Sequence, residues 1–113
     1  MLYKIFIVFL FVPQLIFSNE VEEIFKKGNE QYIKGEYEEA IRSYESIVNK
    51  GYINEQLFYN LGNAYFRNGK LGKAILYYEK AKKISPSDDD INHNLSFANS
   101  RIVDNIETLP KFF

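Results

Sequence analysis

Hydrophobic residues recur at steps of three and four positions through most of the chain after residue 20. Such spacing puts them on one face of an amphipathic helix. The clearest stripe, within residues 54–68, consists of Leu57, Phe58, Leu61, Ala64 and Tyr65. Similar stripes predict helices over residues 21–34, 37–50, 71–84 and 89–106. No segment alternates convincingly as a half-buried strand does, so the pattern predicts an all-α fold.

Residues that begin or end helices stand between these stripes. Gly69 follows residues 54–68 and predicts a left-handed helix cap. Pro86 ends the stripe of residues 71–84, because proline lacks the amide proton that a helix needs. Asp88–Asp90 then offers carboxylates to the start of the next helix. A cation site at this acidic run is disfavoured, since no glycine-containing loop with alternating oxygen ligands surrounds it.

The helical pattern repeats along the chain at a constant interval. Gly28 recurs as Gly62, and the same interval relates Tyr44 to Tyr78. Small residues on facing helices permit close approach, and the tyrosine is expected to fill the seam beside them. The expected structural positions are Gly28, Gly35, Ala40 and Tyr44 in the first copy, and Gly62, Gly69, Ala74, Tyr78, Ala81 and Pro86 in the second. Each copy is thus a pair of helices, and a partial third copy supplies one closing helix.

Residues 1–18 differ from the rest of the chain. One lysine precedes an unbroken apolar run from Ile5 to Val12, and Ser18 follows after Pro13. This order is typical of a secretory signal peptide that is cut near Ser18. An uncleaved membrane anchor is the alternative, although the segment is shorter than the roughly 20 apolar residues that span a bilayer. The expected organisation is a signal or anchor at residues 1–18, repeats at 21–54 and 55–88, a closing helix at 89–106 and a tail at 107–113.

Charge and composition narrow the function. The chain has 14 Lys and Arg and 15 Asp and Glu, which argues against nucleic-acid partners because phosphate binding needs a basic excess. It has no cysteine and one histidine, so thiol chemistry and zinc sites built from Cys or several His are excluded. His93 has no Ser, Cys or paired carboxylate at catalytic spacing, which favours a solvated or groove-lining imidazole. We predict a protein that is not an enzyme, with no catalytic residue, metal or cofactor.

The interval that relates Gly28 to Gly62 resembles the period of the tetratricopeptide repeat (TPR). Residues 55–88 carry the family's pattern at Phe58, Leu61, Gly62, Tyr65, Gly69, Ala74, Tyr78, Ala81 and Pro86. The first repeat departs from it at Lys27, Ile47 and Tyr52, where Leu, Ala and Pro are usual. The resemblance implies a short α-solenoid of two helix-turn-helix repeats plus a closing helix, which acts as a protein–protein interaction scaffold.

A finer resemblance is to the TPR component of bacterial Bat aerotolerance systems, BatE. It rests on the runs Asn60–Tyr65 and Gly72–Glu79, and on Asn94, Leu95 and Ala98–Arg101. This resemblance implies an exported protein of the periplasm or cell envelope whose partner is itself exported or membrane-bound. It also implies an alternative function, that of an accessory subunit in a membrane-associated stress complex that modulates an enzyme.

In the TPR family the first helix of each repeat lines the concave face. The resemblance therefore implies a partner-binding groove of Phe25, Asn29, Tyr32, Tyr59, Asn63, Phe66, Arg67, His93, Phe97 and Arg101. Such a trough of aromatic rings, amides and cations suits an extended peptide or a partner helix. Two interpretations of Asn29 and Asn63 remain open, hydrogen bonding to a bound peptide backbone and a purely structural role.

One known TPR mode, the clamp for a chain-terminal carboxylate, is not expected. By the family resemblance, this chain matches the clamp pattern at Asn29 and Asn60 only. Phe25, Asp90 and Asn94 stand where the clamp needs cations, and Asp90 would repel a carboxylate.

Overall fold

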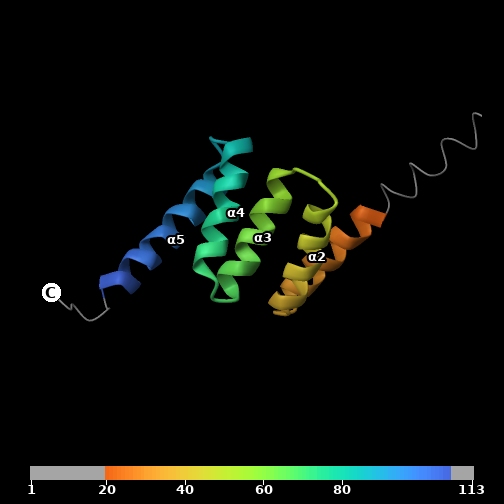
Figure 1. Cartoon of the computed structure of the whole chain (residues 1–113), viewed down its shortest axis with the longest axis horizontal. Coiled ribbons are helices and arrows are strands. Elements are labelled where there is room, and N and C mark those ends of the chain that lie inside the picture. The colour runs from red at the N-terminus through yellow and green to blue at the C-terminus, as the bar shows by residue number, and fades with distance from the viewer. Residues whose placement is uncertain (1–19, 108–113) are drawn as a thin grey trace, which may run out of the picture.

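The computed structural model describes residues 20–107, which form five helices and no strand (Figure 1). The first helix covers residues 20–33. It is followed by α2 (Tyr37–Asn49), α3 (Glu55–Arg67), α4 (Leu71–Ile84) and α5 (Asp89–Glu107). The all-α prediction is confirmed for these residues. The signal or anchor expected at residues 1–18 lies outside them, as does the end of the expected tail.

The helix ends follow from local chemistry. The Asn54 side chain accepts a hydrogen bond from the backbone N–H of Leu57 at 3.0 Å and starts α3. Asp88 does the same for the N–H of Ile91 at 3.1 Å and starts α5. Gly69 ends the α3 turn with φ 78°, a left-handed conformation that costs glycine little. Among residues 20–107, no helix is both long enough and apolar enough to cross a bilayer.

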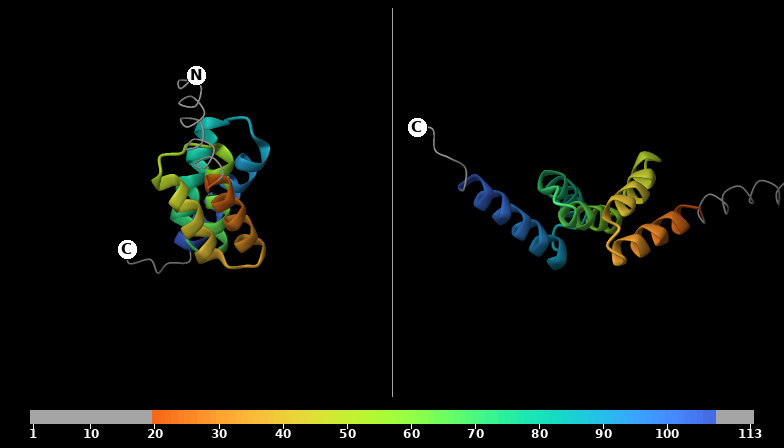
Figure 2. Two further views of the ribbon diagram at one scale, coloured as in Figure 1. Left: turned by 90° about the vertical axis from the view of Figure 1, so that its right-hand side faces the viewer. Right: turned by 90° about the horizontal axis from the view of Figure 1, so that it is seen from below.

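The helices pack as successive antiparallel neighbours (Figure 2). The pair formed by α3 and α4 repeats the pair formed by residues 20–33 and α2, and α5 packs on α4. In each pair a glycine of the first helix faces a tyrosine of the second. A Cβ at Gly28 would lie 2.6 Å from the Tyr44 ring, and a Cβ at Gly62 would lie 2.6 Å from the Tyr78 ring. Only glycine allows this contact, which sets the distance between the helices.

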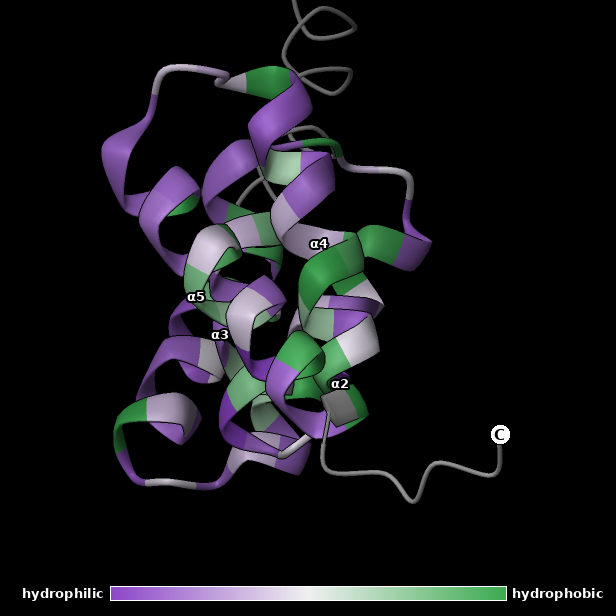
Figure 3. Cartoon of the chain, turned by 90° about the vertical axis from the view of Figure 1, so that its left-hand side faces the viewer, coloured by the Kyte–Doolittle hydropathy of each residue, from purple (hydrophilic) through white to green (hydrophobic). Residues whose placement is uncertain are grey.

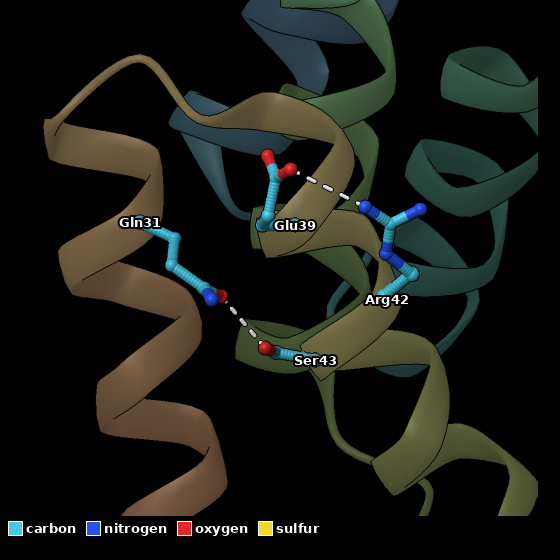
Figure 4. A network of polar contacts seen from close by, with 4 residues as sticks. All are labelled: Gln31, Glu39, Arg42 and Ser43. Atoms are coloured by element: carbon cyan, nitrogen blue, oxygen red, sulfur yellow. Dashed lines mark hydrogen bonds and ion pairs between the residues drawn. The ribbon is translucent and has the colours of Figure 1, made fainter.

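Polar contacts also join the first helix to α2 (Figure 4). The Ser43 hydroxyl donates to the Gln31 side-chain oxygen at 2.7 Å, across the two helices. Arg42 and Glu39 form an ion pair at 3.3 Å within α2. Both side chains of that pair are largely exposed, so its contribution to stability is small, about 0–1 kcal/mol.

The core lies between the helices, and hydrophobic and hydrophilic residues alternate around them (Figure 3). Its most completely buried large side chains are Tyr44, Tyr78 and Leu61. Hydrogen bonds to Glu45 of α2 join three helices. Its carboxylate accepts from the Tyr65 hydroxyl of α3 and, at 3.3 Å, from the Tyr77 hydroxyl of α4. The Tyr65 and Tyr77 rings stack with their centroids 5.6 Å apart. This link fixes the first repeat against the second.

The first part of α5 has a polar outer face, whereas Val103 and Ile106 are exposed further along the helix. In α3, Phe58, Gly62 and Tyr65 face the tyrosines of the following helix, α4. The positions one repeat later, in α5, are Asn92, Ser96 and Asn99. Its inner face buries Ile91, Leu95 and Ala98. Residues 89–99 therefore cover the preceding pair on one face and present polar side chains on the other.

Candidate peptide-binding groove

The first helix of each repeat and α5 border a shared hollow surface. One pocket of about 300 Å³ is lined by Asn29, Tyr32, Ile33, Tyr44, Asn60 and Asn63. A second pocket of about 240 Å³ is lined by Tyr32, Asn63, Phe66, Arg67, Tyr78, Asn94 and Phe97. Tyr32 and Asn63 border both pockets. We therefore treat the two pockets as one continuous hollow, the concave groove.

A hydrogen-bonded asparagine lies at the centre of the first pocket. The Oδ1 atom of Asn29 accepts from the Tyr44 hydroxyl at 2.6 Å and from Nδ2 of Asn60 at 3.0 Å. Two donors on one oxygen fix the orientation of the amide, so its NH2 group must point away from them.

The second repeat builds the same arrangement around Asn63. The Oδ1 atom of Asn63 accepts from the Tyr78 hydroxyl at 2.5 Å and from Nδ2 of Asn94 at 2.9 Å. Asn94 also donates to the Tyr59 hydroxyl oxygen at 3.0 Å. The concave groove therefore holds two copies of one device, each a tyrosine and two asparagines.

The NH2 groups of Asn29 and Asn63 are the unused part of this device. Within residues 20–107 neither group donates a hydrogen bond, and neither is buried without a partner. The oxygen of each amide thus has a structural role, while its NH2 group is open to a ligand. The two interpretations of these asparagines are compatible, because each concerns a different atom, and peptide binding by the NH2 groups stays a prediction.

Burial keeps the two tyrosine donors neutral to well above physiological pH. It raises the pKa of Tyr44 to about 12, and it raises the pKa of Tyr78 further above the ordinary value. A tyrosine with its ordinary pKa near 10 is already protonated at physiological pH, and burial extends this protonation further into alkali, so both hydroxyls donate to the asparagine oxygens. The orientation of the amides does not depend on pH in that range.

Aromatic rings and one cation complete the concave groove. The Phe66 and Phe97 ring centroids lie 5.7 Å apart. The Arg67 guanidinium lies 5.1 Å from the centre of the Tyr37 ring and forms no ion pair within residues 20–107. Burial raises the pKa of Tyr32, although the nearby Arg67 opposes the shift. The groove thus offers donors and one uncompensated positive charge, which together suit carbonyl or carboxylate oxygens.

Most of the residues expected in the groove lie together. Asn29, Tyr32, Asn63, Phe66, Arg67 and Phe97 line the two pockets, and Tyr59 joins them through Asn94. Phe25 lies at a neighbouring pocket and packs on the Tyr44 ring at 5.8 Å. His93 and Arg101 are exposed on α5 and border neither pocket.

Sequence reasoning missed part of the groove. Tyr44 and Tyr78 were expected only to fill seams, yet their hydroxyls orient the asparagines. Asn60 and Asn94 entered as clamp positions and as part of the Bat resemblance but not as groove residues, yet they donate to the same two asparagine oxygens. The signal was present, because both pairs are related by the interval that relates Gly28 to Gly62. Ile33, which the family pattern also places on the concave face, is 83% exposed and adds an apolar edge.

Three comparisons bear on this geometry. Residues 55–88 match the tetratricopeptide repeat family. The chain is 34% identical over 61 residues to Protein bimA of Emericella nidulans, an alignment that covers 54% of this chain and 8% of that protein. It also resembles the crystal structure of the Sgt2 TPR domain from Aspergillus fumigatus, with a TM-score of 0.69 and 25% identity over 75% of this chain and 56% of that chain.

Residues 55–88 thus match a tetratricopeptide repeat, and the described chain folds as a short all-α array like the Sgt2 TPR domain. The chain spans a small part of Protein bimA and just over half of the Sgt2 chain. Both of these relatives are fungal, and neither is a Bat component.

Proposed function

We propose that this chain is a non-catalytic scaffold that binds an extended segment of a partner protein in its concave groove. The observation that carries the proposal is the pair of oriented amides at Asn29 and Asn63, whose NH2 groups have no partner within residues 20–107. An extended peptide presents backbone carbonyl oxygens at regular intervals, and these oxygens can accept hydrogen bonds from both NH2 groups. Amides that are already oriented lose little entropy on binding, which favours affinity.

The rest of the groove supplies side-chain selectivity. The hollows of about 300 and 240 Å³ are each large enough for a bulky apolar side chain, and Tyr32, Phe66 and Phe97 form their walls. Arg67 has no carboxylate partner within residues 20–107 and favours an acidic group on the ligand. We expect the bound segment to combine apolar residues with at least one acidic residue near Arg67.

The cellular setting is a proposal from the sequence alone. The apolar residues 1–18 support export to the cell envelope, with a partner that is exported or membrane-bound. The Asn60–Tyr65 and Gly72–Glu79 runs support a second candidate function, an accessory subunit of a membrane-associated Bat-type complex that modulates an enzyme. Purification of the protein from envelope fractions tests both, because a Bat-type subunit would hold a single stable membrane partner.

The groove itself is tested by two matched variants. Peptides are first selected from a random displayed library on the full chain, and their affinity is measured for each variant. Tyr78→Phe removes a hydroxyl that orients Asn63, and Tyr65→Phe removes a hydroxyl that contacts Glu45 outside the groove. Each loses one hydrogen bond, worth about 1 kcal/mol. Both should lower the melting temperature, but only Tyr78→Phe should also weaken peptide binding, by about two- to tenfold.

Asn63→Ala completes the set, since it removes the NH2 donor itself. It should weaken the selected peptides at least as much as Tyr78→Phe does. If Asn63→Ala and Tyr78→Phe leave every selected peptide with unchanged affinity, the amides are not the binding groups and the proposal is wrong.

A further inference from the structure

A separate hollow lies on the face formed by the second helix of each pair. It has a volume of about 400 Å³ and lies between the end of α2, the loop that follows it and α4. Its walls include Tyr52, Ile53, Phe58, Lys80, Lys83 and Ile84. We call it the convex pocket. In the described part of the chain α2 and α4 make no close backbone contact, and the Tyr77–Glu45 hydrogen bond joins them through side chains.

The convex pocket is apolar and open. Phe58 is buried, with 6% of its surface exposed, whereas Ile53 is 78% exposed and Ile84 is 42% exposed. Tyr52 is also exposed, at 41%. Large apolar side chains that gather around one hollow indicate a surface that other molecules cover.

The repeat provides an internal control. At the equivalent loop of the second repeat, Tyr52 and Ile53 are replaced by Pro86 and Ser87. One repeat earlier, in α2, the positions of Lys80 and Lys83 are occupied by Ser46 and Asn49. The helix pair therefore folds without these apolar and basic residues, and the convex pocket is a feature of this junction alone.

Two lysines give the convex pocket its charge. The Lys80 Nζ atom lies 5.2 Å from the centre of the Tyr77 ring and 5.8 Å from that of Phe58, contacts that hold the ammonium at the pocket wall. Neither Lys80 nor Lys83 forms an ion pair among residues 20–107. A ligand that brings a carboxylate would neutralise them.

We propose that the convex pocket is a second docking site, which takes an acidic segment of a partner protein that carries one large apolar anchor residue. The anchor enters the hollow over Phe58, between Ile53 and Ile84, and neighbouring carboxylates pair with Lys80 and Lys83. A protein segment fits better than an anionic membrane. The site is a hollow of side-chain size that a single anchor residue can enter, whereas a membrane presents a broad surface.

The probe is a library of short synthetic peptides with a central leucine and flanking positions drawn from Asp, Ser, Gly and Lys. The library is selected on the full chain and on a variant that carries Lys80→Glu and Lys83→Glu. We expect the natural chain to enrich Asp beside the leucine and the variant to enrich Lys instead. Ile53→Ser should weaken the enriched peptides about tenfold or more.

Three controls keep the outcome decisive. Lys73→Glu changes the charge of α4 outside the convex pocket and should leave the Asp preference intact. Asn63→Ala should leave these peptides bound, which separates the convex pocket from the concave groove. Melting temperatures confirm that each variant is folded. The proposal is overturned if no acidic preference appears or if the preference survives in the Lys80→Glu, Lys83→Glu variant. Binding to phosphatidylglycerol vesicles is measured alongside, and the proposal is also overturned if this variant loses vesicle binding but keeps peptide binding.

Discussion

At the scale of single residues, the groove depends on the protonation and placement of a few tyrosine hydroxyls. Tyr44 and Tyr78 each donate to an asparagine oxygen of the concave groove. These hydroxyls are enclosed, so their ionised forms are disfavoured in the folded protein. The same side chains thus serve the core with their rings and the groove with their oxygens.

The tyrosines predict how stability changes in alkali. Burial raises the pKa of Tyr44 to about 12 and also raises the pKa of Tyr65, Tyr77 and Tyr78. In the unfolded chain a tyrosine ionises near pH 10. Above about pH 10 the unfolded state therefore binds fewer protons than the folded state, and the free energy of unfolding should fall as pH rises.

A spectroscopic titration checks this prediction. Of the nine tyrosines, the enclosed ones should form phenolate only as the helical circular dichroism is lost. Ionisation of all tyrosines near pH 10 with the helices intact would contradict the burial described here.

At the scale of the helices, the glycine–tyrosine contact decides how closely each pair packs. Gly62→Ala places a Cβ 2.6 Å from the buried Tyr78 ring, which has little room to move. We expect it to lower the free energy of unfolding by roughly 1–3 kcal/mol. Urea denaturation measures the change.

Gly72→Ala is the matched control for that change. Gly72 lies in α4, and nothing lies within 4 Å of a Cβ added there. Alanine favours a helix interior over glycine by about 1 kcal/mol; Gly72 is the second residue of α4, so this variant should be slightly stabilised. If Gly62→Ala is stabilised as well, the close contact between α3 and α4 is wrong.

Much of the helix arrangement could be predicted from sequence. The helix signals depend only on residues that are close in sequence. Hydrophobic stripes mark the helices, and their ends are marked by residues such as Gly69 and Asp88–Asp90. The Glu45 contacts could not be predicted in the same way, because they join residues 20 and 32 positions apart. The orientation of the Asn29 and Asn63 amides likewise depends on partners brought from other helices. The pattern therefore predicts which side chains share a face but not which atoms remain open to a ligand.

At the scale of the whole molecule, two helix pairs and a closing helix present two different surfaces. The concave groove offers amide donors and one arginine, while the convex pocket offers an apolar hollow with two lysines. The two surfaces draw on different residues, although both belong to the same packed array. Under the two proposals, each face takes its own partner segment.

The central claim is that the concave groove binds a peptide through the NH2 groups of Asn29 and Asn63. Side-chain amide signals in a nuclear magnetic resonance titration of the full chain with a selected groove peptide test it most directly. The account predicts that the NH2 signals of Asn29 and Asn63 shift with the added peptide, while that of Asn49, exposed at the end of α2, stays in place. Saturable binding that leaves the Asn29 and Asn63 signals unmoved would contradict it.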